Sequence, residues 1–204
     1  MLTNPNAWFT VPMPDDGLPV LCPQSPAEWD AWLTSHHADS AGLWLKIPRK
    51  GSGAPGVSYP DALRVALCHG WIDGQKGRLD DDHWLQRFTP RKAASKWSRI
   101  NREQATALIE AGRMRPAGLR EVERAQADGR WAAAYEPPST AAVPEDLARA
   151  LEADDAARAF FATLDRANRY AILYRIADAK RPETRARRIV TFVTMLSEGK
   201  KIHP

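Results

Sequence analysis

The chain has 204 residues, of which 44% are hydrophobic and 26% are charged, and its net charge at pH 7 is +4. This balance excludes a disordered or fibrous chain and leaves enough apolar surface for a substantial core. The two cysteines, Cys22 and Cys68, are too few for a secreted disulfide framework. No signal peptide or membrane-spanning segment is evident in the sequence, so we expect a cytoplasmic protein.

The first half of the chain alternates between helix and strand signals. Residues 1–24 are rich in proline and predict an extended arm. A helix should follow, because Ser25 is a good N-cap and Pro26 suits the first helical position. The run GLWLKI (residues 42–47) predicts a strand, and a second helix is predicted over residues 58–70.

The next segment predicts an antiparallel hairpin. Two strand-like runs, residues 71–79 and 83–89, are joined by three consecutive aspartates. On paired strands, Trp71 and Trp84 could form a cross-strand aromatic contact.

Beyond the hairpin the apolar residues recur at helical spacing. Asn101 resembles the capping residue of one helix, and Pro116 begins another. The stretch YEPPSTAAVP cannot continue a helix because of its prolines, and it predicts a linker. After the linker the pattern is helical to the end; Asp165, for example, caps a helix whose apolar face includes Tyr170.

Together these elements predict an α+β fold, in which a small antiparallel sheet with covering helices is followed by a C-terminal helical subdomain. The predicted domain organisation is an arm over residues 1–24, an α+β domain over 25–135, a linker over 136–144 and a helical subdomain over 145–204.

Charge is segregated along the chain. Residues 85–135 contain 11 Lys and Arg against 5 Asp and Glu, and residues 165–204 contain 10 against 4. The remaining segments, 1–84 and 136–164, are each acidic by four charges. An electropositive face and an anionic partner are therefore plausible, although ordinary solvated helices have the same composition.

The most distinctive candidate site is the segment RFTPRKAASKWSRIN, residues 87–101. Its basic side chains alternate with Phe88, Trp97 and small hydroxyl residues, which suits the binding of phosphate or carboxylate beside a stacking ring. The alternative is that the aromatic residues enter the core and the arginines surround them. The predicted ligand-binding residues lie where the hairpin meets this segment: Trp71, Asp73, Arg87, Arg91, Lys92, Ser95, Trp97 and Asn101.

Enzyme and metal sites have less support in the sequence. His69 or His83 with Asp73 could form an acid–base pair, but no nucleophile elbow, P-loop or dinucleotide fingerprint is present. Cys68 beside His69 lacks zinc-ligand spacing, and the three aspartates lack the pattern of a calcium loop. We therefore assign no catalytic residue, metal or cofactor; an enzyme would need a pocket that gathers His69, Asp73 and Arg87.

Several blocks of the sequence, YPDALRVALCHGWIDG, RFTPRKAASKWSRIN, LIEAGRMRPAG and ETRARRI with EGKK, resemble the bacterial YdeI/OmpD-associated family, also labelled bacteriocin-protection proteins. The resemblance extends from Trp44 onward and departs at His69, where the family has an aromatic residue. It implies an α+β fold followed by helices, and a role in tolerance of cationic antimicrobial peptides and envelope stress. It brings no established cofactor, substrate or catalytic residue, and its description favours the periplasm.

We therefore expect a non-enzymatic, stress-associated binding protein with an anionic ligand at the basic-aromatic surface. A nucleic-acid-binding protein is one alternative; it would use residues 85–102 and 180–188 together, and its affinity would fall steeply with salt. A small-molecule enzyme is the other alternative. The oligomeric state is left open by the sequence.

Overall fold

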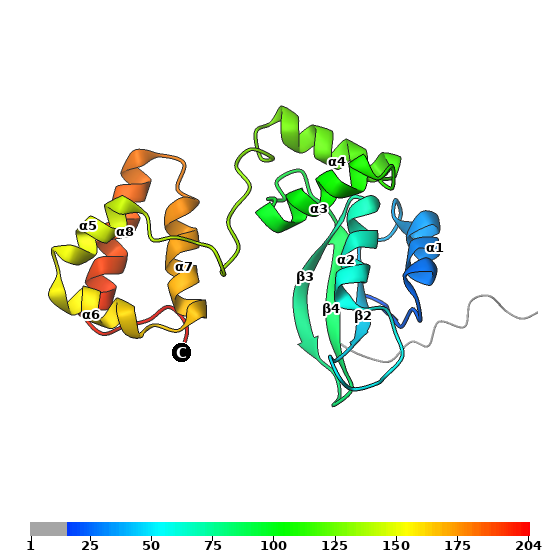
Figure 1. Cartoon of the computed structure of the whole chain (residues 1–204), viewed down its shortest axis with the longest axis horizontal. Helices are drawn as coiled ribbons and strands as arrows, with labels where there is room; N and C mark the ends of the chain where they lie inside the picture. Colours follow the sequence, from blue (N-terminus) through cyan, green and yellow to red (C-terminus); the bar gives the residue numbers. More distant parts are fainter. Residues whose placement is uncertain (1–15) are drawn as a thin grey trace, which may run out of the picture. The chain divides into compact units, whose positions relative to one another are not determined.

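The computed structural model describes residues 16–204, so most of the predicted arm lies outside the described residues. These residues divide into two units, which are described separately (Figure 1). The N-terminal unit contains residues up to 97 and residues 101–133, and the C-terminal unit contains residues 98–100 and 134–204.

A four-stranded sheet with the order β1-β2-β4-β3 lies at the centre of the N-terminal unit (Figure 1). Its strands are β1 (Val20–Leu21), β2 (Leu43–Pro48), β3 (Trp71–Arg78) and β4 (His83–Pro90). The predicted antiparallel hairpin of β3 and β4 is confirmed, and β2 pairs antiparallel with β4.

The strand β1 lies within the predicted arm and makes the sheet mixed. It pairs in parallel with β2, with Val20 opposite Trp44, and this parallel strand was not predicted. The three predicted strands are antiparallel, and the predicted α+β fold is confirmed. Two buried residues are too short a run to show a strand period, but they pair with a strand edge that would otherwise be open. A small buried cluster contains one residue from each of three strands: Val20 of β1, Trp44 of β2 and Leu85 of β4.

The register of the hairpin separates its two tryptophans. Trp71 lies opposite Pro90 and Trp84 lies opposite Arg78, at the two ends of the ribbon. The predicted contact between Trp71 and Trp84 is therefore wrong. Trp84 instead contacts the ring of Tyr59, with 5.6 Å between the ring centres.

A β-bulge interrupts the hairpin between Asp73 and Lys76. Gln86, which is fully buried, fills this position from the neighbouring strand. Its side-chain amide donates to the carbonyls of Gly74 and Gln75, at 2.9 and 3.2 Å. These bonds satisfy backbone groups that the bulge removes from the strand ladder.

Two helices, α1 (Pro26–His36) and α2 (Tyr59–Cys68), lie beside the sheet (Figure 1). Both begin as predicted, because the hydroxyls of Ser25 and Ser58 accept backbone N–H groups of their first turns. Trp29 of α1 is fully buried and places its ring 5.8 Å from Phe88 of the sheet.

The helices α3 (Arg99–Glu110) and α4 (Pro116–Ala127) follow the hairpin. Asn101 lies inside α3 and is buried, so the prediction that it caps this helix is wrong. The helix begins two residues earlier, where the N–H of Arg99 donates to the carbonyl of Tyr135 at 2.8 Å. This bond satisfies one of the first-turn N–H groups that have no partner within the helix.

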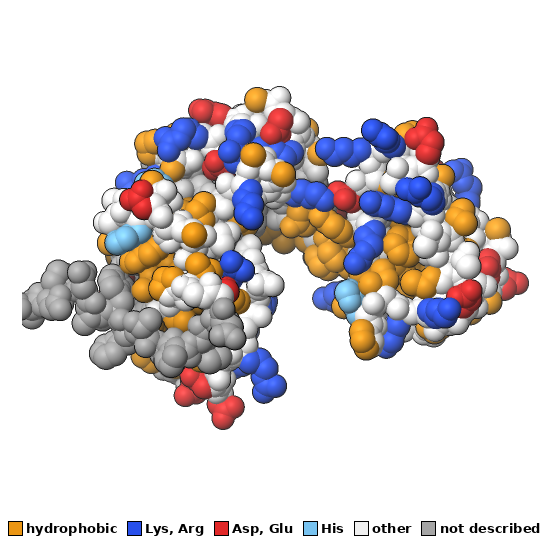
Figure 2. Space-filling view, turned by 180° about the vertical axis from the view of Figure 1, so that it is seen from behind, with side chains coloured by type: hydrophobic (Ala, Val, Ile, Leu, Met, Phe, Trp, Pro, Cys, Tyr) orange, Lys and Arg blue, Asp and Glu red, His pale blue; other side chains and the backbone are white. Residues whose placement is uncertain are grey.

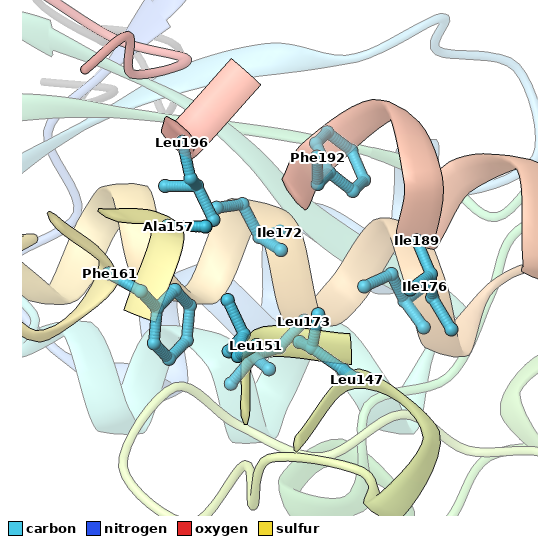
Figure 3. Packing of buried hydrophobic residues seen from close by; sticks show 10 residues of the cluster. All are labelled: Leu147, Leu151, Ala157, Phe161, Ile172, Leu173, Ile176, Ile189, Phe192 and Leu196. Atoms are coloured by element: carbon cyan, nitrogen blue, oxygen red, sulfur yellow. The ribbon is translucent and has the colours of Figure 1, made fainter. Parts of the chain in front are cut away.

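The C-terminal unit contains four helices, α5 (Glu145–Glu152), α6 (Asp155–Thr163), α7 (Arg166–Ala177) and α8 (Pro182–Ser197). Asp154 and Asp165 cap α6 and α7, as predicted. The four helices share one apolar core, and Figure 3 shows its side chains packed together: Leu147, Leu151, Ala157, Phe161, Ile172, Leu173, Ile176, Ile189, Phe192 and Leu196. Within residues 16–204, no helix has the length and apolar character needed to cross a bilayer.

Candidate functional site

Part of the predicted basic-aromatic segment folds around Trp97. This side chain is buried, and its ring centre lies 4.8 Å from that of Trp131. The guanidinium of Arg91 lies 3.5 Å from the Trp97 ring centre, and its Nη1 donates to the carbonyl of Lys96 at 3.2 Å. The pair of cation and indole therefore exists, but only 6% of Arg91 is exposed, so the pair faces the protein interior.

Neighbouring polar groups hold the same loop in place. The hydroxyl of Ser95 accepts the N–H of Lys92 at 2.9 Å, and the carbonyl of Ser95 accepts Nη1 of Arg130 at 2.6 Å. Arg102 donates to the carbonyl of Trp131 at 3.3 Å. The guanidinium groups of Arg130 and Arg102 thus donate to backbone carbonyls, which favours a structural role for this part of the segment.

The other predicted residues have partners elsewhere. Trp71 is fully buried and donates to the carbonyl of His37 at 3.1 Å. Asp73 accepts the hydroxyl of Tyr59 at 2.7 Å. Arg87 lies at the sheet, where its Nη1 is 3.7 Å from Asp16 and donates to Gln75 at 3.3 Å. The structure thus brings together Arg91, Lys92, Ser95 and Trp97, whereas Asn101 is buried in α3.

The three residues that an enzyme was expected to gather have different partners. His69 contacts Asp30, while Asp73 contacts Tyr59 and Arg87 contacts Asp16. The described residues also contain no group of three or more His, Cys, Asp or Glu that could hold a metal ion.

Asp30 connects three helices of the N-terminal unit. Its carboxylate is 2.8 Å from Nε2 of His69, at the end of α2, and accepts Nη2 of Arg115, before α4, at 2.9 Å. Burial raises the pKa of Asp30, but the hydrogen bonds from His69 and Arg115 outweigh burial, so the pKa lies below its usual value. Burial lowers the pKa of His69 in spite of Asp30, so the neutral imidazole donates its Nε2–H to the carboxylate.

We predict that acid weakens the N-terminal unit in two steps. Below pH 6.5, the usual pKa of histidine, the unfolded chain binds a proton that folded His69 does not yet bind, so the free energy of unfolding falls. A second loss occurs below 3.8, as pH falls through the lowered pKa of Asp30. Urea unfolding followed by tryptophan fluorescence should show both losses.

Two variants separate the steps. His69→Gln should remove the loss that begins near pH 6.5. Asp30→Asn should reduce the loss below 3.8 without removing it, because the pKa values of Asp61, Asp80 and Asp128 in the same unit are also lowered. Parallel stability curves for both variants and the parent chain from pH 7 to pH 3 would contradict this assignment.

Asp30 and Arg115 also line a pocket of about 480 Å³ in the N-terminal unit. Cys68 lies in its wall, but burial raises the pKa of this thiol, so it remains protonated and a poor nucleophile at neutral pH. Both oxygens of the Asp30 carboxylate are already bonded, to His69 and Arg115, so this carboxylate is not available to a ligand. Arg113 also lines this pocket.

A second pocket, of about 570 Å³, lies in the C-terminal unit along the exposed face of α7. We call it the α7 pocket. Figure 2 shows basic side chains beside exposed apolar surface on this unit, and the pocket combines the same two kinds of group. It is lined by Pro138, Arg166, Ala167, Tyr170, Ala171, Tyr174, Arg175 and His203.

Local bonds fix the walls of the α7 pocket. Asn168, which is 1% exposed, accepts the N–H of His203 at 2.8 Å and donates to its carbonyl at 3.3 Å, so the C-terminal tail is held against α7. The hydroxyl of Tyr170 donates to the carbonyl of Glu136 at 2.9 Å. The ring of Tyr174 meets the ring of Tyr135 nearly at a right angle, 5.2 Å between centres.

The electrostatics of the α7 pocket favour an anion. Its charged lining residues, Arg166 and Arg175, are both basic, and no Asp or Glu lines it. Burial, with the neighbouring phenols and Glu136, raises the pKa of Tyr170 to about 12, so this phenol is neutral at physiological pH.

None of the eight predicted site residues lines either pocket. Tyr170 was expected only on the apolar face of its helix, and the stripe of Arg166, Tyr170 and Tyr174 at i, i+4 and i+8 was not predicted as a site. That spacing was the available signal, because side chains four residues apart lie on the same face of a helix.

Comparison with known families divides the chain in a similar way. Residues 21–121 match a domain of unknown function, DUF8412, and residues 140–199 match the family described as bacteriocin-protection, YdeI or OmpD-associated. Three of the blocks that suggested this family, those within residues 59–118, thus lie in the match to the other domain. No curated protein and no solved structure matches the chain.

Proposed function

We propose that this chain, whose residues 140–199 match the bacteriocin-protection, YdeI or OmpD-associated family, is a non-enzymatic binding protein of a bacterial stress response. It acts in the cytoplasm and binds an anionic ligand. The binding site is the α7 pocket rather than the segment around Trp97.

The composition of the α7 pocket is the observation that carries this proposal. It combines two arginines with two tyrosines and has the volume of a small-molecule site, and all its lining residues except Pro138 and His203 lie in the part of the chain that matches the family. Guanidinium groups donate paired hydrogen bonds to phosphate and carboxylate, and phenol rings supply apolar contact area.

The charge of the pocket also limits how protection would operate. Cationic antimicrobial peptides would be repelled by Arg166 and Arg175, so direct capture of such a peptide in this pocket is unfavourable. Protection would instead depend on an anionic molecule of the cell whose binding changes the behaviour of the protein. A neutral tyrosine with a pKa of about 12 is a poor base, which favours binding over catalysis.

Nucleic-acid binding has weaker support. Within residues 85–102, Arg87 pairs with Asp16, and Arg91 and Arg102 donate to backbone carbonyls. In the second predicted patch, residues 180–188, Arg185 donates to both oxygens of Asp146. Guanidinium groups with such partners are less available to phosphates than free ones.

The proposal predicts binding of a multivalent inorganic anion. Titration calorimetry with millimolar pyrophosphate should detect binding to the parent chain, and replacing both Arg166 and Arg175 by alanine should weaken it by about tenfold or more, since charged hydrogen bonds contribute about 1.5–3 kcal/mol each. The matched control is Arg187→Ala, an exposed arginine of α8 outside the pocket. No binding by the parent, or equal binding by all three proteins, would refute the proposal.

A further inference from the structure

We infer that the ligand of the α7 pocket carries a planar aromatic ring together with its anionic group, and that a nucleoside monophosphate is the chemical class that fits. This inference rests on the proposed function and adds the identity of the ligand. Its basis is the order of side chains along α7 and the way in which each aromatic side chain is held.

The first step is the order of groups along the helix. Arg166, Tyr170 and Tyr174 occupy three successive turns of one face of α7. Eight residues of helix span about 12 Å, so the cation and the farther ring are separated by a distance comparable to the length of a nucleotide. A phosphate at Arg166 would therefore place an attached base over the tyrosines.

The second step is the space beside this stripe. Ala167 and Ala171 occupy the neighbouring positions of α7 and also line the pocket. Their small side chains leave room for a flat group next to the phenol rings, and Pro138 forms an apolar wall. A small inorganic anion would leave most of this apolar surface without a partner, whereas a base would cover it.

The third step is that both rings are already fixed. Tyr170 is held by its hydrogen bond to the carbonyl of Glu136, and Tyr174 by its ring contact with Tyr135. The two rings contact each other, with 5.9 Å between centres. Because the hydroxyl of Tyr170 is used by the backbone, its ring surface remains for ligand contact, and little rotamer entropy is lost on binding.

The fourth step concerns the end of the pocket at Arg166 and His203, where the carboxylate of Asp165 also lies close to His203. Asn168, two residues after Arg166, holds His203 beside the first turn of α7. Its imidazole can donate to a phosphate oxygen, in addition to the guanidinium of Arg166. Arg175 donates to the carbonyl of Ala171 at 3.0 Å, so it is aligned with its own helix at the other end.

The test compares AMP, adenosine and inorganic phosphate by titration calorimetry on the full-length chain. We expect AMP to bind about tenfold or more tightly than either of its parts, because a stacked base and a bound phosphate each contribute. Tyr174→Leu removes one of the two rings, so it should reduce AMP affinity toward that of phosphate. Tyr174→Phe, which keeps the ring, should restore AMP binding.

The outcomes separate this inference from the proposed function. Equal affinities for AMP and phosphate, or no effect of Tyr174→Leu on AMP binding, would overturn the nucleotide inference and leave anion binding in place. Failure of AMP, phosphate and pyrophosphate to bind would overturn both. Equal affinities for adenosine and AMP would also overturn the nucleotide inference, since the phosphate of AMP would then contribute nothing. Far-ultraviolet circular dichroism verifies that each variant keeps its helices.

Discussion

Replacing Gly118 by alanine should destabilise the N-terminal unit by about 1–3 kcal/mol, the usual cost of overpacking. Gly118 lies in the first turn of α4, which packs against the end of α2. A Cβ at this position would overlap the carbonyl oxygen of Cys68 and lie 2.8 Å from that of Leu67. Both atoms are backbone, so they cannot move away as a flexible side chain could.

The expected destabilisation by Gly118→Ala is opposite in sign to the usual effect of this substitution in a helix. Glycine to alanine within a helix normally stabilises it by about 0.5–1 kcal/mol, because alanine loses less backbone entropy on folding. All eight tryptophans precede residue 132, so tryptophan fluorescence during urea unfolding reports on the N-terminal unit. The control is Ala127→Gly, at the exposed end of α4, with an expected cost below about 1 kcal/mol. Stabilisation by Gly118→Ala would show that α2 and α4 are not in close contact.

Local signals explain which parts of the fold could be predicted. The helices α1, α6 and α7 begin where Ser25, Asp154 and Asp165 accept a first-turn N–H group, and each of these bonds spans three residues of sequence. The hairpin could be predicted for the same reason, because β3 and β4 are adjacent in sequence. The mixed sheet was missed because the pairing of Val20 with Trp44 joins distant residues, and a two-residue strand has no period to recognise.

The candidate site was harder to predict for the same reason. The sequence shows that Arg91 lies among basic and aromatic residues, but it does not show that Arg91 is only 6% exposed and donates to the carbonyl of Lys96. Burial together with such a partner turns an apparent ligand-binding cation into a structural one. Conversely, the α7 pocket depends on the tail at His203 and on Pro138, both far in sequence from Tyr170. Only the tertiary structure brings these residues together.

Trp29→Ala should have the largest effect on the stability of the N-terminal unit. The indole is fully buried, contacts the rings of Trp32, Trp71 and Phe88, and donates to the carbonyl of Ala62 at 3.1 Å. Removing it leaves a cavity between α1 and the sheet, so we expect a loss of about 3–5 kcal/mol in the free energy of unfolding.

Trp29→Phe separates the ring from its hydrogen bond. Phenylalanine keeps much of the aromatic contact but removes the donor to Ala62, so its cost should be clearly smaller than that of alanine. Urea unfolding followed by circular dichroism avoids the loss of a fluorescent residue. The helices of the C-terminal unit have a core of their own and should unfold at an unchanged urea concentration. A cost below about 1 kcal/mol for Trp29→Ala would mean that the aromatic cluster is not the centre of this core.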